Sequence, residues 1–452
     1  MESGLRTYTV REVIEGRSLS RFQMATVALC ALVVVLDGFD AQCIGFLAPA
    51  ISDDLAIPLK NFGPIFAASL FGLMIAAMFV GPVADRVGRK WPAILSTLAF
   101  AAFSVLSARA YTFTGLRLLR FLTGLGLGGS MPNAVALTSE YVPRRLQHVF
   151  VAMLFAGMPL GAMIASVASA KMIPAWGWRS VFYLGGILPL LMALALLLLL
   201  PESVQFLTVR GADPRKIAAI MKKIAPEISP EAFSRVPAEE RLPGVPVKHL
   251  FTEGRALGTI LLWVPYFLNL LIIYFIVSWL PGLLRQSAMP ISAGVTAIFM
   301  FSLGGAIGSL IEGRMMNAWS PYAVLLAEFV VSTLLIGSLA YLGSSFSLMM
   351  AVTLVLGIVV QGAQGGLNAL AATFYPTAVR STGVGWALGV GRVGSIAGPL
   401  LAGVLLKLEW SPQQILLAGA APAGVAAVAV LISHWLRANA TIFHPAAEAQ
   451  QP

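Results

Sequence analysis

Long apolar runs follow one another along almost the whole chain and limit the folds it can adopt. Only 11% of the residues are charged and 58% are hydrophobic, whereas about 25% of a soluble domain is charged. A run of about 18 apolar residues can cross a bilayer as a helix. A β-barrel is excluded, because its strands would be segments of about 10 residues with alternating hydrophobicity. We therefore predict an all-α integral membrane protein with twelve transmembrane helices, at 22–50, 62–83, 92–109, 113–141, 149–172, 180–200, 258–284, 290–312, 321–342, 346–374, 381–406 and 412–436.

The basic residues predict the orientation of these helices. With a cytoplasmic N-terminus, most of the 30 Lys and Arg residues fall on the inner side, as the positive-inside rule requires. The net charge of +10 then follows from topology, so no nucleic-acid partner is expected. The first apolar run is too long for a signal-peptide core, and we expect the N-terminus to be retained. These features predict a multi-pass protein of the cell inner membrane with both termini in the cytoplasm.

One long polar stretch divides the predicted helices six and six. Its mixture of Lys, Arg, Glu and Pro suits a cytoplasmic linker on the membrane surface. The predicted organisation is a cytoplasmic tail at 1–21, an N-terminal six-helix bundle at 22–200, the linker at 201–257, a C-terminal six-helix bundle at 258–436 and a cytoplasmic tail at 437–452.

The two halves repeat each other at an offset close to 232 residues. Repeats of six helices are the architecture of many secondary transporters, in which substrate binds near the bilayer midplane. Single matches arise by chance, but several at nearly one offset favour a transporter. The matches pair Asp37 with Asn269, Pro49 with Pro281, Asn133 with Asn368, Pro143 with Pro376 and, more loosely, Asp85 with Glu312.

Asp37 and Asp40 lie in the middle of the first apolar run, which is otherwise free of charge. Their spacing of three residues places both on one face of a helix. Acidic residues at membrane depth commonly mark ion or proton pathways. Burial and mutual repulsion favour protonation of at least one of them, and a nearby cation such as Arg120 would favour its ionised form. We predict a proton site here; the alternative is a pair held permanently by a fixed internal cation.

An anionic substrate would need a cation, and apart from Arg109 and Lys171 at the outer ends of their helices, the predicted helices contain only Arg117, Arg120 and Arg392. Arg117 starts its helix and can extend its side chain to the membrane surface. Arg392 lies too deep for that, and its planar guanidinium suits a carboxylate. We predict that Arg392 binds the substrate; the alternative is a structural partner for a buried acid such as Asp37.

Further polar and aromatic residues are candidates for contacts with the rest of the substrate. Gln361, Gln364 and Asn368 share one face of a helix, although such amides also join helices to one another. Phe39, Tyr274 and Trp386 are candidates for stacking on a ring, although most aromatic side chains serve packing. Glu140 and Glu328 lie nearer the helix ends and receive no predicted role.

Two segments carry a family resemblance. The segment GPVADRVGRK at 81–90 resembles the loop between helices two and three of the major facilitator superfamily, departing only at Val83. The resemblance implies the major facilitator fold and a gating role for Asp85, Arg86 and Arg89; the alternative is an anchor of topology. RFLTGLG at 120–126 resembles the pattern of helix four, in which the arginine, here Arg120, is tied to proton coupling. Glycines at positions 124, 126, 128 and 129 predict that this helix packs closely against a neighbour.

Several further motifs carry a narrower resemblance. They are LDGFDAQCIGFLAP at 36–49, PNAVALTSEYVP at 132–143, GWRSVF at 177–182, LPES at 200–203 and RSTGVGWALGVGRVGSIAGP at 380–399. With these motifs the chain is similar to the aromatic acid:proton symporter family over nearly its whole length, apart from the linker and tails. This resemblance implies uptake of benzoate-like or hydroxybenzoate-like aryl carboxylates, driven by the inward proton gradient.

Other classes of function fit less well. An enzyme or haem carrier would need reactive or axial residues at membrane depth, but the four histidines lie at helix ends or in polar segments. Cys30 and Cys43 share one helix and form neither a disulfide nor a metal pair. We expect no cofactor beyond the coupling proton, and function as a monomer. The alternatives are a receptor, an exporter or exchanger of organic anions or drugs, and an importer of a non-aromatic acid.

Overall fold

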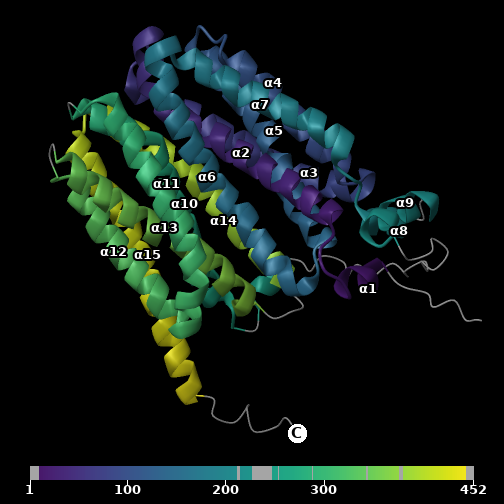
Figure 1. The fold of residues 1–452 in the computed structure, drawn as a ribbon. Helices are drawn as coiled ribbons and strands as arrows, with labels where there is room; N and C mark the ends of the chain where they lie inside the picture. The colour runs from purple at the N-terminus through teal and green to yellow at the C-terminus, as the bar shows by residue number, and fades with distance from the viewer. Residues whose placement is uncertain are drawn as a thin grey trace, which may run out of the picture. The chain divides into compact units, whose positions relative to one another are not determined.

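The computed structural model describes residues 10–210, 214–226, 247–252, 254–287, 289–342, 345–375 and 380–443, which form helices and no strand. Figure 1 shows the long helices. They are α2 Arg21–Asp54, α3 Gly63–Val87, α4 Lys90–Ser107, α5 Phe113–Tyr141, α6 Arg144–Trp176, α7 Trp178–Leu199, α10 Ala256–Gln286, α11 Ile291–Ala318, α12 Pro321–Leu339, α13 Phe346–Phe374, α14 Arg380–Lys407 and α15 Pro412–Phe443. Shorter helices are α1 Val10–Glu15, η1 Leu59–Asn61, α8 Val204–Val209, α9 Pro214–Ile224 and η3 Val247–Leu250.

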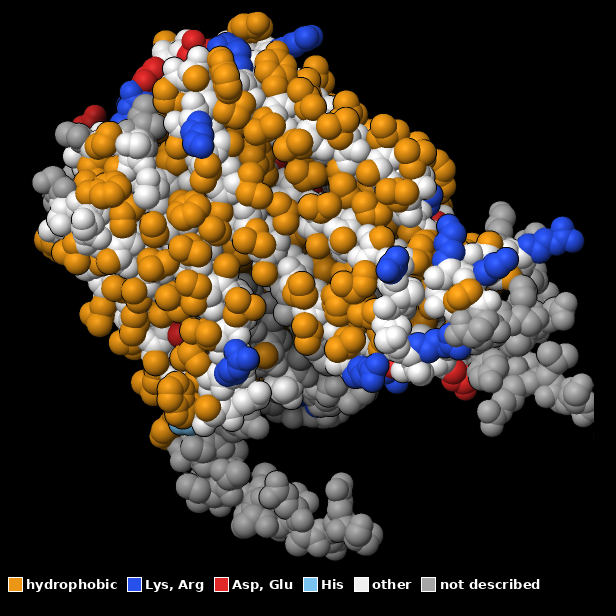
Figure 2. All heavy atoms as spheres, viewed as in Figure 1, with side chains coloured by type: hydrophobic (Ala, Val, Ile, Leu, Met, Phe, Trp, Pro, Cys, Tyr) orange, Lys and Arg blue, Asp and Glu red, His pale blue; other side chains and the backbone are white. Residues whose placement is uncertain are grey.

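The predicted all-α membrane architecture is confirmed. Within the described residues, 11 helices are long and apolar enough to cross a membrane. Helix α5 is the remaining long helix, with 29 residues, and its glycines and two arginines lower its hydropathy. Large apolar side chains such as Leu198 and Leu334 are exposed on the helix faces, and Figure 2 shows hydrophobic side chains over much of the visible surface. Such faces are suited to contact lipid.

Several helices extend further than their apolar runs. Helix α11 continues to Ala318, although the apolar pattern predicted an end at residue 312. Helix α6 likewise begins at Arg144, before the predicted start at residue 149. A helix need not end with its apolar stretch, because its backbone hydrogen bonds are satisfied internally at any depth. The extension of α11 places Glu312 inside a helix rather than at its end.

Contacts between residues divide the chain into two compact units. The first contains residues 1–43 and 68–242, and the second contains residues 44–67 and 243–452. The division therefore cuts α2 after Cys43 and α3 after Ala67, in addition to the predicted linker. In the second unit, Arg285 of α10 pairs with Asp53 and donates to the carbonyl oxygen of Pro49.

Glycines on α5 allow the close packing of the first unit. A Cβ atom at Gly124 would collide with the backbone of Ser69 on α3, and one at Gly126 would collide with Phe100 on α4. Small residues let membrane helices approach closely, as the glycine pattern of this segment predicted. The close approach brings Arg120, on the same helix, near polar side chains of α4.

Candidate functional site

A fully buried ion pair lies in the first unit. Arg120 Nη1 of α5 lies 3.1 Å from Asp40 Oδ2 of α2, and both side chains are fully buried. The other oxygen, Asp40 Oδ1, accepts a hydrogen bond from Ser104 Oγ of α4 at 2.6 Å. The carboxylate is therefore compensated on both oxygens, which is the condition under which a buried charge is tolerated.

The guanidinium of Arg120 is also held on its remaining sides. Its Nη2 atom donates to Ser107 Oγ at 3.0 Å and to Thr123 Oγ1 at 2.9 Å. Its Cζ atom lies 4.6 Å from the centre of the Phe182 ring on α7, within the range of a cation–π contact. These contacts join α2, α4, α5 and α7 around one charge.

Asp37 has a different environment from Asp40. Ser130 Oγ of α5 donates to Asp37 Oδ2, whereas Asp37 Oδ1 is buried without a hydrogen-bond partner among the described residues. No described cation forms an ion pair with this carboxyl group, which is only 3% exposed. The alternative, an acid held permanently by a fixed internal cation, thus applies to Asp40. Asp37 lacks the compensation that a permanent charge at this depth would need.

The second unit carries a row of amides at the position matched to Asp37. Asn269 of α10 donates to Val360 O at 3.1 Å and to Gln364 Oε1 of α13 at 3.0 Å. Asn368 Oδ1 accepts from Tyr266 OH at 2.8 Å. These hydrogen bonds join α10 to α13, as the hydrogen bond between Ser130 and Asp37 joins α5 to α2. The tyrosine was not predicted from the sequence.

The remaining polar and aromatic candidates are spread over several helices. Gln361 donates to Phe301 O of α11 at 3.1 Å and so joins two helices, the alternative role for an amide. Trp386 is exposed and stacks on Trp263. Tyr274 is buried on α10, and Phe39 lines an apolar groove of α2, α6 and α7 in the first unit. Their predicted ring contacts stay predictions.

Arg392 lies near the middle of α14 and is neither fully buried nor fully exposed. Among the described residues, no acidic side chain pairs with its guanidinium. Close packing of α14 on α10 is allowed by Gly394, where a Cβ atom would collide with the Phe267 carbonyl oxygen. The guanidinium is therefore a cation available to an anion within the second unit.

The predicted gating turn is tied to residues that were not predicted. Gly88 has a φ of 99°, which glycine adopts readily, and Arg89 Nε lies 2.9 Å from Glu140 Oε1. Glu202 Oε1 accepts from the backbone N–H groups of Arg89 and Lys90, at the start of α4. A carboxylate at a helix N-terminus is favourable.

The other two residues of this turn are less constrained. Arg86 is exposed, and its carbonyl oxygen accepts a hydrogen bond from Arg210 Nη2 at 2.6 Å. The side chain of Asp85 lies outside the described residues. Glu202 belongs to the LPES motif, but nothing in that motif by itself indicates the partner of this acid.

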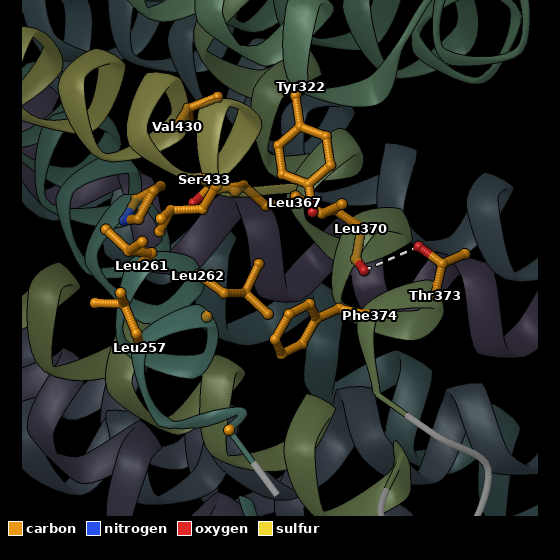
Figure 3. A pocket seen from close by; sticks show the side chains of 14 residues that line it. Leu257, Leu261, Leu262, Tyr322, Leu367, Leu370, Thr373, Phe374, Val430 and Ser433 are labelled. Atoms are coloured by element: carbon orange, nitrogen blue, oxygen red, sulfur yellow. Dashed lines mark hydrogen bonds between the residues drawn. The ribbon is translucent and has the colours of Figure 1, made fainter. Parts of the chain in front are cut away.

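A pocket of about 540 Å³ lies in the second unit, among α10, α12, α13 and α15. Figure 3 shows leucine side chains, Phe374 and Tyr322 around it. The hydroxyl of Thr373 is turned to its own helix, where it donates to Leu370 O at 3.0 Å. Among the described residues, no charged side chain lines this pocket, so none of them offers it the cation that a carboxylate would need.

Comparison with known proteins identifies the family. The family model of the Major Facilitator Superfamily matches residues 30–345. The chain belongs to the major facilitator superfamily. The 4-hydroxybenzoate transporter PcaK of Pseudomonas putida is 41% identical to this protein, and the match covers 94% of this chain and 96% of the transporter. The gallate transporter of Pseudomonas putida is 37% identical over 96% of each chain.

A third relative and a solved structure agree with this assignment. The 3-(3-hydroxy-phenyl)propionate transporter of Escherichia coli is 35% identical over 90% of this chain and 93% of the relative. The crystal structure of a bacterial homologue of the human lysosomal transporter Spinster gives a TM-score of 0.70 at 15% identity and covers 92% of this chain and 98% of that one. At that identity only the fold is supported. Relatives named as transporters confirm that this superfamily member is a transporter and not an enzyme.

Proposed function

We propose that the protein imports aromatic carboxylates together with protons across the cytoplasmic membrane, by alternating access, with both termini inside. The observation that carries this proposal is full-length similarity to transporters whose names specify aromatic acids, 4-hydroxybenzoate and gallate among them. The buried acids and the available arginine supply chemistry for a proton and a carboxylate. The protein acts as a monomer, with lipid as its surroundings and without a metal or an organic cofactor.

Asp37 carries the coupling proton in this mechanism, and the Asp40–Arg120 pair is its fixed neighbour. Asp37 has one oxygen without a partner and no cation among the described residues, so the neutral, protonated form suits its closed environment. Access to water lets the proton leave. Asp40 keeps its charge because Arg120 and Ser104 compensate it.

Arg392 binds the substrate carboxylate. A guanidinium offers two parallel N–H donors to the two carboxylate oxygens, which offsets the desolvation of the anion. The amide row of Asn269, Gln364 and Asn368, with Tyr266, supplies donors and acceptors for ring substituents. The turn with Asp85, Arg86 and Arg89 controls the inner gate, since Arg89 is tied to two acids of other segments.

The function is tested by uptake into proteoliposomes with a panel of labelled acids. We expect accumulation of hydroxybenzoates or related aryl acids under an imposed pH gradient that is acidic outside, and its loss when a protonophore removes the gradient. Cyclohexanecarboxylate serves as the non-aromatic control of similar size. Accumulation of the control alone, or efflux from loaded vesicles without uptake, would favour a carrier for non-aromatic acids or an exporter.

Arg392→Lys should weaken binding of an aryl carboxylate by about 1–3 kcal/mol, or roughly 5- to 150-fold, because an ammonium cannot reproduce the guanidinium fork. Arg392→Gln should lose at least as much. The measurement is the binding of an acid and of its neutral amide to purified protein. The amide should bind wild type weakly and be almost indifferent to the substitution. Equal losses for both ligands would indicate a collapsed site, and no loss for the acid would exclude Arg392 as its partner.

A further inference from the structure

Two glutamates that play no part in the proposed mechanism are buried together in the second unit. Glu312 of α11 is 3% exposed and Glu328 of α12 is 5% exposed. Their carboxyl groups lie beside the same glycine of α13, Gly362. Both carboxylate oxygens of Glu312, and Oε2 of Glu328, are buried and receive no hydrogen bond from any described donor. Both residues belong to helices apolar and long enough to span the membrane.

Helix α13 provides a notch for these two carboxyl groups. A Cβ atom at Gly362 would lie 2.8 Å from Glu328 Oε1 and 3.4 Å from Glu312 Oε2. One turn further, a Cβ atom at Gly366 would collide with Glu312 Oε1. Both carboxyl groups therefore rest against the α13 backbone in space that any larger residue would fill. Burying an acid that has no function would cost free energy. The space for two carboxyl groups beside one helix therefore indicates a functional site.

Among the described residues around the pair, no charge compensates the two acids. Arg314, two residues from Glu312 on α11, is exposed. Tyr322 of α12 packs against the ring of His434 on α15, which is exposed. Gln361 of α13 donates to Phe301 O. Within the described part of the chain, no Lys, Arg or His forms an ion pair with either glutamate.

Two adjacent carboxylates cannot both stay ionised in such a place, since like charges a few ångströms apart repel and burial removes their hydration. One bound cation resolves the conflict. A metal ion would need more oxygen ligands than two carboxyl groups, and no group of three metal-ligating acid, His or Cys side chains occurs among the described residues. A proton needs only the two facing oxygens.

We propose that Glu312 and Glu328 form a proton-binding site in which the two carboxyl groups share one proton. The protonated carboxyl donates to the carboxylate of its partner, so that the pair carries one negative charge instead of two. The site lies in the second unit, whereas Asp37 and Asp40 lie in the first. It goes beyond the proposed function, because it adds a proton site that substrate coupling through Asp37 does not use.

Infrared spectroscopy of the full-length protein in lipid tests this site. The measurement uses a background with Asp37→Asn, which removes the other acid to which the proposed mechanism assigns a proton. At neutral pH we expect a carbonyl-stretching band of one protonated carboxylic acid per chain, shifted in deuterated water. The band should disappear when Glu312→Gln and Glu328→Gln are combined. Glu409→Gln is the matched control, because this glutamate is exposed in the same unit, and the band should remain.

Two further measurements test the site if the double glutamine variant folds poorly. Gly366→Ala should shift the band without removing an acid, because the added methyl displaces Glu312 from the notch. Thermal stability should be equal in sodium chloride and choline chloride at one ionic strength. Absence of the band in the background protein, its persistence in a folded double glutamine variant, or stabilisation by sodium that depends on the two glutamates would each overturn the proton site.

Discussion

Asp37→Asn should abolish accumulation of aromatic acid driven by a pH gradient while leaving the protein folded. Asparagine has nearly the shape of aspartate, and its carbonyl oxygen can still accept the hydrogen bond from Ser130. It cannot bind and release a proton, so the pH gradient can no longer drive the transport cycle. Exchange of labelled for unlabelled substrate at equal pH should continue, since it needs no net proton movement. The measurement is accumulation and exchange in the same proteoliposomes.

Asp53→Asn is the matched control for this substitution. It makes the same chemical change on the same helix, but the Asp53 side chain is 60% exposed in its pair with Arg285. Exposed ion pairs contribute little to stability, about 0–1 kcal/mol, and accumulation should be unchanged. An Asp37→Asn protein that still concentrates substrate under the gradient would remove Asp37 from the proton pathway.

Arg120→Gln should destabilise the protein by about 3–5 kcal/mol, the usual effect of removing one partner from a buried ion pair. The substitution leaves Asp40 charged and without its cation, at a position with no exposure. It also leaves the hydroxyl groups of Ser107 and Thr123 without their donor. The measurement is the unfolding of purified protein in detergent, followed by heat or denaturant, together with uptake.

Arg117→Gln tests whether the effect belongs to the buried pair. Arg117 lies one turn earlier on α5, and its side chain is exposed beside the ring of Phe113. Its replacement should change stability by less than about 1 kcal/mol. Combining Arg120→Gln with Asp40→Asn should recover part of the lost stability, because it removes the uncompensated charge. Equal destabilisation by Arg117→Gln and Arg120→Gln would contradict the special role of the Asp40–Arg120 pair.

The different behaviour expected of Asp37 and Asp40 follows from their neighbours rather than from their positions. Both face α5 from α2, as a spacing of three residues predicts. Asp40 meets Arg120 and Asp37 meets Ser130. A serine can stabilise either form of a carboxyl group, whereas an arginine stabilises only the ionised form. One acid is therefore suited to titration and the other to a fixed structural charge.

The sequence by itself determined the membrane architecture, because hydropathy and charge are local properties of the chain. The apolar runs predicted the long helices, and the orientation that the basic segments indicate stays a prediction. The motifs around Asp37, Gly81 and Arg392 pointed to the transporter family that the relatives support. The glycines near Arg120 predicted close packing, since a missing Cβ atom has the same consequence wherever two membrane helices meet.

Only the tertiary structure decided which polar groups meet. Asp40 and Arg120 are 80 residues apart, and Arg89 and Glu202 are 113 apart. No local sequence pattern indicates these partners, because the packing of the helices determines which distant residues meet. The Glu312–Glu328 pair was hidden for two reasons: the apolar pattern ended α11 too early, and the notch depends on the backbone of a third helix. Burial and compensation of a charge are properties of the packed helices, and they distinguish the paired Asp40 from Asp37.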